Sequence, residues 1–83
     1  MRQLDLFPDE LRLVSVGRAR DGRRFYAMAI RRDLFGAWIL EREWGRIGRP
    51  GRMRHDLHPD PRAATDALLA LAEIKLERGY RRD

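Results

Sequence analysis

The sequence predicts an α+β domain in which a small antiparallel sheet of four to five strands is followed by one long C-terminal helix. Three observations support this: alternating apolar residues between positions 11 and 57, glycine- and proline-containing breaks between those runs, and a helical apolar period after position 60. The chain has 83 residues and no cysteine, which excludes a disulfide framework. We expect one domain at residues 10–83, preceded by an extension at residues 1–9.

Two strands are predicted in the first third of the chain. Apolar residues alternate over residues 11–16, and aromatic and apolar residues recur over residues 24–31. Between these runs, Asp21-Gly22 favours a type I′ hairpin, because both central residues of that turn take positive φ. We therefore expect the two strands to pair as a hairpin.

The middle of the chain predicts two more strands. A connection with an apolar tip at residues 32–36 leads into a third strand at residues 37–42, whose Trp38 is expected in the core. Three glycines and one proline within residues 44–51 indicate tight backbone geometry in the next connection. A fourth strand at residues 52–57 is polar, which favours an edge of the sheet.

One helix is predicted from Pro61 to about Arg78. Asp60 suits the N-cap, Pro61 suits the first helical position, and Gly79 suits the left-handed C′ position. The apolar arc of this helix is wide, so we expect the helix to lie deep against the sheet. The arc consists of Ala64, Ala67, Leu68, Leu69, Leu71, Ala72, Ile74 and Leu76.

Lys75 is the only lysine of the chain and falls inside this apolar arc. Two interpretations stay open. In one, its aliphatic stem packs on the sheet while its ammonium group favours the helix C-terminus. In the other, it is a point charge that reaches a carboxylate or a bound phosphate near Trp44.

Positive charge gathers in one segment of the chain. The sequence has 17 Arg and one Lys against 13 acidic residues, a net charge of +5. GC-rich coding would explain why Arg replaces Lys, but it does not explain the surplus or its uneven placement. Guanidinium groups bind phosphate and carboxylate bidentately, so the segment suits recognition of such groups. Its arginines are Arg42, Arg46, Arg49, Arg52 and Arg54.

Catalysis is not expected, nor is a cofactor or a small-molecule substrate. The one serine, Ser15, lies inside an apolar run, which is a poor position for a nucleophile. Glu41 and Glu43 are explained as arginine partners within the sheet rather than as a catalytic pair. No apolar run approaches the roughly 18 residues of a membrane span. Residues 1–10 lack a signal-peptide core, so we expect a cytoplasmic protein.

A metal site is not expected either. His55, Asp56 and His58 resemble a set of ligands, and we expect that the two imidazoles can share one face of a strand. No further strong ligand lies nearby in the sequence, and helix capping already explains Asp60. An edge strand and a loop that ends in a helix cap therefore explain the same residues.

Three stretches together resemble the WGR domain family. They are Arg24-Phe25-Tyr26, residues 40–51 with Trp44-Gly45-Arg46 at their centre, and the run from Lys75 to Gly79-Tyr80. Their order and spacing are similar to those of the family over about residues 11–82. The resemblance implies a compact antiparallel sheet with one helix and no active site of its own. The chain looks like the free-standing bacterial form of this domain.

In poly(ADP-ribose) polymerases, the WGR domain is a DNA-break-binding module beside a separate catalytic domain. There the motif Trp packs on the sugar or base at a strand end and the motif Arg contacts DNA, roles that would fall on Trp44 and Arg46. The resemblance thus implies a non-catalytic module that binds DNA ends or breaks without reading base sequence. The family usually has Gln where this chain has Arg52. The predicted nucleic-acid-binding residues are Arg42, Trp44, Gly45, Arg46, Arg49, Arg52 and Arg54.

Two alternatives stay open for the same residues. Trp44 is also explained as a core residue that caps the sheet, since large aromatic side chains are usually buried. The basic loop is also suited to an acidic segment of another protein, which would make the chain a protein–protein interaction module of a bacterial regulatory or DNA-repair assembly. An exposed indole that stacks on a terminal base would instead contribute about 1–3 kcal/mol to DNA binding.

A separate motif precedes the domain. Gln3-Leu4-Asp5-Leu6-Phe7 looks like the Gln-Leu-Asp/Ser-Leu-Phe peptide by which bacterial polymerases and accessory proteins dock on the replicative sliding clamp. In that interpretation Leu6 and Phe7 fill an apolar pocket. Leu4 adds contact, and Gln3 sets the register through its amide. In the alternative interpretation Leu4 and Leu6 alternate as a short strand that covers a sheet edge.

Overall fold

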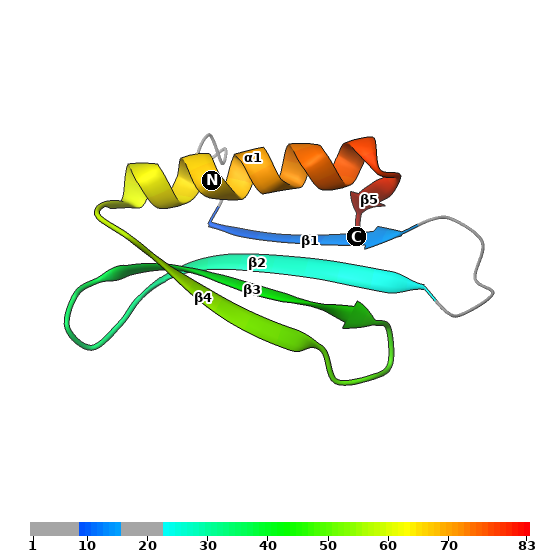
Figure 1. Ribbon diagram of the computed structural model, residues 1–83, viewed down its shortest axis with the longest axis horizontal. Coiled ribbons are helices and arrows are strands. Elements are labelled where there is room, and N and C mark those ends of the chain that lie inside the picture. Colours follow the sequence, from blue (N-terminus) through cyan, green and yellow to red (C-terminus); the bar gives the residue numbers. More distant parts are fainter. Residues whose placement is uncertain (1–8, 16–22) are drawn as a thin grey trace, which may run out of the picture.

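The computed structural model describes residues 9–15 and 23–83. Over these residues it contains five strands, all paired antiparallel, and one helix that packs on one face of the sheet (Figure 1). The predicted α+β class is confirmed. The predicted Asp21-Gly22 turn lies outside the described residues. The elements are β1 (Glu10–Ser15), β2 (Arg24–Arg32), β3 (Trp38–Arg46), β4 (Arg52–His58), α1 (Pro61–Glu77) and β5 (Tyr80–Arg82).

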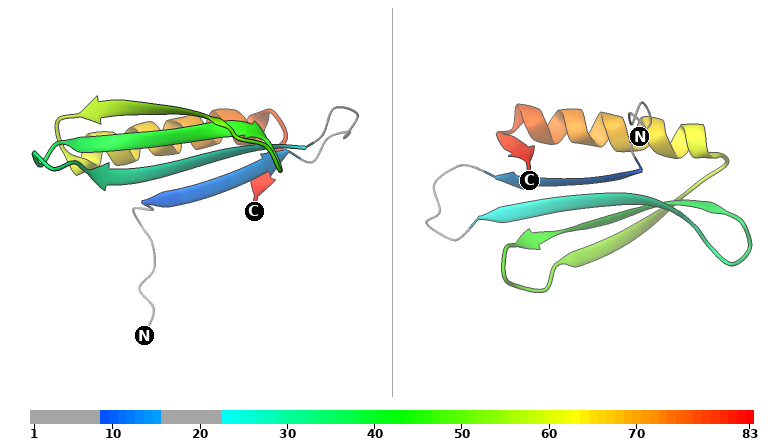
Figure 2. Two further views of the ribbon diagram at one scale, coloured as in Figure 1. Left: turned by 90° about the horizontal axis from the view of Figure 1, so that it is seen from below. Right: turned by 180° about the vertical axis from the view of Figure 1, so that it is seen from behind.

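The strand order in the sheet is β4-β3-β2-β1-β5. The first four strands follow one another as neighbours, and α1 then crosses the sheet before β5 pairs with the free edge of β1. Seen from below, in the left panel of Figure 2, the strands lie in front of α1, so the helix covers a single face. The prediction that residues 52–57 form an edge strand is confirmed, because β4 has β3 as its one neighbour.

The third strand is longer than predicted. The glycines after residue 42 indicated a loop, but β3 continues to Arg46. Its pairing with β2 runs from Trp38 opposite Arg32 to Arg46 opposite Arg24. The continuous ladder with β2 outweighs the low strand propensity of Gly45. Consequently Trp44 lies in a strand and not in the loop that follows it.

Both ends of α1 are those that the sequence indicates. Asp60 has an extended backbone, and its carboxylate accepts a hydrogen bond from the Ala63 N–H at 2.8 Å. Pro61 follows at the start of the helix, where its missing N–H costs nothing. Arg78 is the C-cap, and Gly79 takes a φ of +100°, in the left-handed region that favours glycine. The chain can therefore turn directly into β5.

The core lies between α1 and the sheet face that it covers, the inner face. Leu13, Leu40 and Leu68 are fully buried there, one each from β1, β3 and α1. The helix lies less deep than predicted, because Leu69 and Leu76 on one flank and Ile74 on the other stay nearly half exposed. A single helix on a sheet buries one stripe, and residues about 100° from the centre of that stripe do not reach the strands. The buried residues of α1 are Ala64, Thr65, Leu68 and Ala72.

Trp38 lies at the margin of the core, whereas the sequence predicted it inside. It is partly buried at the first position of β3, at one end of the sheet. The guanidinium carbon of Arg32 lies 4.8 Å from the centre of its ring. An arginine therefore covers this indole at a place where the core cluster does not extend.

The outer face of the sheet, opposite α1, has a small apolar patch of its own. Val14, Phe25 and Ala29 are buried on this face. The Arg12 guanidinium lies 4.8 Å from the centre of the Phe25 ring and is held by Asp83 at 2.6 Å. A charged side chain thus shields the apolar patch with its planar group.

Two glycines let β3 and β4 approach each other closely beside Phe25. A Cβ on Gly51 would lie 2.6 Å from the Trp44 carbonyl oxygen and 2.9 Å from the Phe25 ring. A Cβ on Gly45 would lie 3.0 Å from the Gly51 Cα. Position 51 therefore has no room for a side chain unless the end of the hairpin moves.

We expect Gly51→Ala to lower the free energy of unfolding by about 1–3 kcal/mol, because a backbone oxygen cannot yield to the new methyl group. Chemical denaturation followed by circular dichroism measures this. Arg49→Ala, an exposed position in the same turn, is the matched control and should change stability by less than about 0.5 kcal/mol. Equal stability of Gly51→Ala and the parent protein would contradict the close approach.

Candidate nucleic-acid interface

Trp44 lies near the end of β3 on the inner face of the sheet. It is paired with Tyr26 in β2 and with Arg52 in β4. Its ring stacks on Tyr26, with centroids 5.8 Å apart and planes inclined by 17°. The side chain packs against the core cluster and is partly buried. The structure thus combines the two interpretations of Trp44, since part of the indole closes the core and part meets solvent.

Lys75 reaches the same place from α1. Its Nζ lies 4.5 Å from the ring centre of Tyr26 and 5.6 Å from that of Tyr80. The ammonium group itself therefore lies over the sheet, beside the Trp44–Tyr26 stack, and both interpretations of this residue stay predictions. Burial lowers the pKa of Lys75, and the positive charges of Arg78 and Arg42 lower it further. An anion bound here would relieve that repulsion.

Three of the predicted arginines accompany Trp44 on the inner face. Arg42 precedes it by two residues in β3, and its guanidinium carbon lies 5.9 Å from the indole centre. Arg54 and Arg52 are the β4 partners of Arg42 and Trp44, so all four side chains share one face. We call this surface the basic aromatic face. Its members are Tyr26, Arg42, Trp44, Arg52, Arg54, Lys75 and Arg78.

Asp56 offsets part of the charge of this face. Its carboxylate lies 2.8 Å from Arg42 Nε and 2.9 Å from Arg54 Nε. Burial alone would raise the pKa of Asp56, but hydrogen bonds from Arg42 and Arg54 outweigh it and hold the pKa below its ordinary value. Arg42 also donates from Nη1 to the Tyr26 hydroxyl at 3.1 Å. These two arginines are therefore less available to a phosphate than the sequence alone indicated.

The remaining predicted site residues lie around the β3–β4 turn. Arg46 ends β3 and is partly buried, and Arg49 is exposed beside Gly48, whose φ is +89°. The close approach to Gly51 explains Gly45 without a ligand, so a role for Gly45 toward DNA stays a prediction. Within the described part of the chain, the side chains of Arg49, Arg52 and Arg78 make no hydrogen bond or ion pair.

The sequence did not predict Tyr26 or Arg78 as site residues, nor Tyr80, which lies beside Lys75. Tyr26 and Tyr80 belong to the first and last of the three motif stretches, and that was the available signal. The contact of Tyr26 with Trp44 depends on the pairing of β2 with β3, and the contact of Tyr80 with Lys75 depends on the turn that follows α1. Spacing along the chain does not contain that information.

His55 and His58 lie on opposite faces of β4, so the expectation that they can share one face is wrong. Residues three apart in a strand point to opposite sides. His55 Nε2 lies 3.1 Å from Glu41 Oε2 on the outer face, whereas His58 is paired with Trp38. Among residues 9–15 and 23–83, no group of three or more His, Cys, Asp or Glu side chains is placed to hold a metal ion.

The prediction that Glu41 pairs with an arginine is confirmed. Its carboxylate lies 3.3 Å from Arg31 Nε and also contacts His55. The hydrogen bond to His55 lowers the pKa of Glu41, burial opposes this, and Arg31 lowers the pKa further. Glu43 makes no ion pair with another described residue, so its predicted pairing is not confirmed.

No helix in the described segments is long and apolar enough to cross a bilayer.

Comparison with known proteins identifies the family of the chain. The uncharacterized protein y4dW of Sinorhizobium fredii is 41% identical over 63 residues, which are 76% of this chain and 31% of that protein. The chain therefore spans about a third of the length of this relative. No solved structure matches the chain. The model of the WGR domain family matches residues 10–83, and we conclude that the chain belongs to the WGR domain family.

Proposed function

We propose that the basic aromatic face binds DNA ends or breaks. In this proposal the chain acts as an accessory module without catalytic activity. The WGR domain is a non-catalytic module that occurs in nucleic-acid-binding contexts. The observation that carries the proposal is the position of Trp44, which stacks on Tyr26, lies beside Arg42 of β3 and opposite Arg52 of β4, and has Lys75 of α1 over the same tyrosine ring.

The stack supports recognition of an end rather than of a continuous duplex. One side of the Trp44 indole is held by Tyr26, and the side chain is partly exposed beyond it. A terminal base or sugar has an unstacked face that an indole can cover, whereas the bases inside a duplex are already stacked. Because Tyr26 fixes the ring beforehand, little side-chain freedom is lost on binding.

The charges around the indole support phosphate binding without base readout. Arg49, Arg52 and Arg78 have no partner among the described side chains, and Lys75 is held among other cations. Phosphate contacts of this kind position a duplex but carry no sequence information. The same cations also suit an acidic peptide, so a protein-interaction module is the second candidate and salt-dependent DNA binding separates the two.

We expect Trp44→Ala to weaken binding to a blunt duplex by about 1–3 kcal/mol, because it removes the stacking platform. Fluorescence anisotropy with a short labelled duplex measures the affinity, with a closed circular duplex as competitor. Trp44→Phe keeps a ring on Tyr26 and should retain most of the affinity. Circular dichroism at the assay temperature must show both variants folded.

Equal affinity of the parent protein for linear and circular DNA would refute end recognition. If Trp44→Ala unfolds, or if it folds and binds as tightly as the parent protein, the indole serves the core alone.

We expect a log–log salt dependence with a slope of about −3.6 on duplex DNA, the value for four phosphate contacts from Arg49, Arg52, Lys75 and Arg78. Arg52→Gln and Lys75→Met should each make the slope less steep by about 0.9. Lys75→Met keeps the apolar stem on Tyr26, so its thermal stability should not fall. Arg62→Gln, an exposed position at the other end of α1, is the matched control with an unchanged slope. Absence of binding at low salt would leave the protein-interaction candidate.

A second partner is proposed from the Gln3–Phe7 peptide, which lies outside the described residues. All five positions agree with the sliding-clamp docking peptide, with Gln3, Leu4, Leu6 and Phe7 as the contacting side chains. Such a contact would bring a module that does not read sequence to replicating or repaired DNA by raising its local concentration.

We expect the protein to bind the purified clamp in a calorimetric titration and Leu6→Ala/Phe7→Ala to abolish that binding, since the two apolar anchors supply most of the contact energy. DNA binding by the double variant should be unchanged. A parent protein that does not bind the clamp ends this proposal and leaves the DNA proposal standing.

A further inference from the structure

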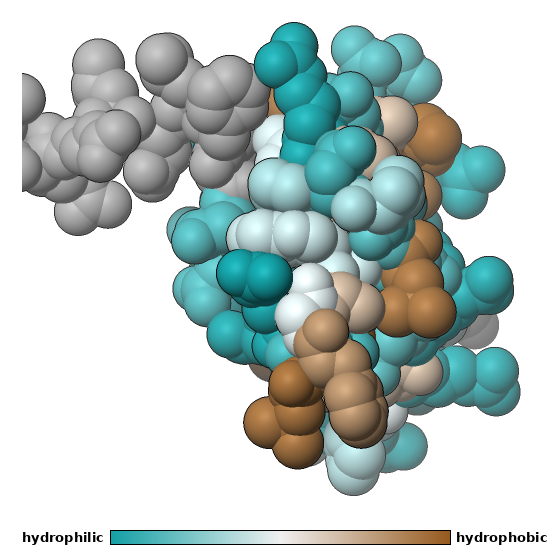
Figure 3. Space-filling model, turned by 90° about the vertical axis from the view of Figure 1, so that its left-hand side faces the viewer, coloured by the Kyte–Doolittle hydropathy of each residue, from teal (hydrophilic) through white to brown (hydrophobic). Residues whose placement is uncertain are grey.

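The turn between β2 and β3 presents two large apolar side chains to solvent. Leu34 and Phe35 are 99% and 94% exposed. Figure 3 shows hydrophobic surface at the lower tip of this end of the molecule, where Figure 1 places the turn. Adjacent apolar residues with this exposure are expensive to leave in water, each by about the transfer energy of a whole side chain. They therefore indicate an interface rather than a loop without function.

The turn is held in one conformation. The Asp33 carboxylate accepts hydrogen bonds from the Phe35 N–H at 2.9 Å and the Ala37 N–H at 2.8 Å. Gly36 takes a φ of +84°, which closes the turn. The Arg32 guanidinium donates to the Gly36 carbonyl oxygen at 3.3 Å and stacks on Trp38. Leu34 and Phe35 are thus presented on a fixed backbone with a guanidinium group beside them.

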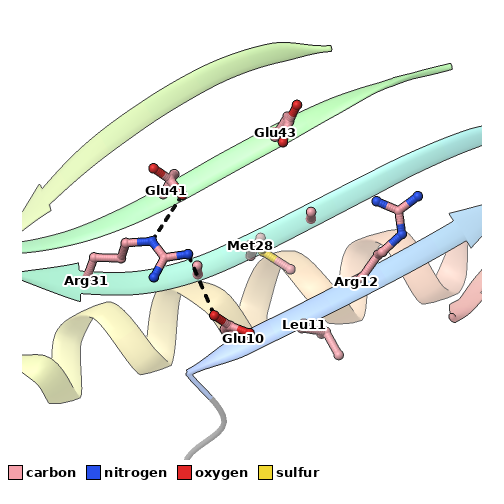
Figure 4. Close-up of a pocket in the computed structure, with 9 residues that line it drawn as sticks. Glu10, Leu11, Arg12, Met28, Arg31, Glu41 and Glu43 are labelled. Atoms are coloured by element: carbon pink, nitrogen blue, oxygen red, sulfur yellow. Dashed lines mark hydrogen bonds and ion pairs between the residues drawn. The ribbon is translucent and has the colours of Figure 1, made fainter. Parts of the chain in front are cut away.

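The outer face of the sheet contains a hollow that matches these features. Its volume is about 370 Å³, and a cavity of about 150 Å³ already holds a benzene ring. Ala27 and Ala29 are among its lining residues and, as small side chains, leave the space open between the longer ones. Glu10 and Arg12 line it from β1, and Glu41 and Glu43 line it from β3 (Figure 4).

The two surfaces also carry complementary charges. Glu43 makes no ion pair with another described residue, whereas Arg12 is held by Asp83 and Arg31 by Glu41 and Glu10. The carboxylate of Glu43 is therefore available to an incoming cation. The turn carries the positive charge of Arg32, which donates to Gly36 and stacks on Trp38 but has no carboxylate partner among the described residues. An incoming turn would place apolar groups on alanine and a cation beside a carboxylate.

We propose that two copies of this chain dimerise through their outer faces, with the Leu34–Phe35 turn of each copy seated in the hollow of the other. The turn curves away from α1 (Figure 1), so it projects toward the side on which the hollow opens. Because each copy contributes the same turn and the same hollow, the interface is isologous. Its two-fold symmetry limits the assembly to a dimer. The basic aromatic face lies on the inner side of the sheet and stays free in this arrangement.

Each copy contributes one turn and one hollow, so we expect a weak dimer. Sedimentation equilibrium of the full chain between about 1 μM and 1 mM should show a reversible monomer–dimer equilibrium, the range expected of interfaces of this size. Leu34→Ser/Phe35→Ser should raise the dissociation constant about 100-fold, because it removes both apolar anchors. Ala27→Arg fills the hollow with a long charged side chain and should raise the dissociation constant to a similar extent. Leu76→Ser, half exposed on α1, is the matched control without effect.

Disulfide trapping gives a second measurement because the chain has no cysteine of its own. Phe35→Cys and Ala27→Cys proteins of different tag length, mixed under mild oxidation, should form the mixed dimer in preference to either like pair. Leu76→Cys in place of Phe35→Cys should give no preference. A parent protein that stays monomeric at the highest concentration overturns the proposal. So does a dimer that survives both Leu34→Ser/Phe35→Ser and Ala27→Arg.

Discussion

The contact that joins the fold to the candidate site is the stack of Trp44 on Tyr26. Tyr26 is buried in the core cluster beneath α1, and its ring also meets the Lys75 ammonium group at 4.5 Å. Its hydroxyl accepts a hydrogen bond from Arg42 at 3.1 Å. One aromatic side chain therefore positions an indole, a guanidinium and an ammonium group that come from β3 and α1. Any loss of packing around Tyr26 would disturb the candidate site and the core together.

The electrostatics of the basic aromatic face are divided between paired and unpaired cations. Asp56 holds Arg42 and Arg54, and those hydrogen bonds keep the pKa of Asp56 low despite its burial. Lys75 has the opposite environment, in which burial and neighbouring cations lower its pKa. The Arg42–Asp56 pair links β3 to β4, whereas the crowded ammonium group gains most from an anion. The strands thus supply shape, and the end of α1 supplies much of the available charge.

The two faces of the sheet are suited to different partners. The inner face carries aromatic rings and cations, whereas the outer face carries alanines with carboxylates on both sides. This division follows from strand alternation, since Arg42 and Trp44 point inward while Glu41 and Glu43 point outward. The two proposals therefore use opposite faces of the sheet and do not compete for the same residues.

Local sequence determined much of this fold. Asp60, Pro61 and Gly79 mark the ends of α1 because capping depends on one residue and its immediate backbone. The polar edge strand and the apolar turn at residues 32–36 follow from composition in the same way. The three motif stretches were enough to indicate the family and to select Trp44 and its arginines.

Tertiary structure decided what those residues contact. The length of β3 depended on its ladder with β2, which carries Trp44 out of the predicted loop and onto Tyr26. The role of Gly51 depended on a carbonyl and a ring from two other strands. The neutralisation of Arg42 depended on Asp56 across the β3–β4 pair, and the exposure of Ile74 depended on how much of one helix a five-stranded sheet can cover. These contacts depend on distances between elements. A pattern of residues along the chain does not determine such distances until the strands are paired.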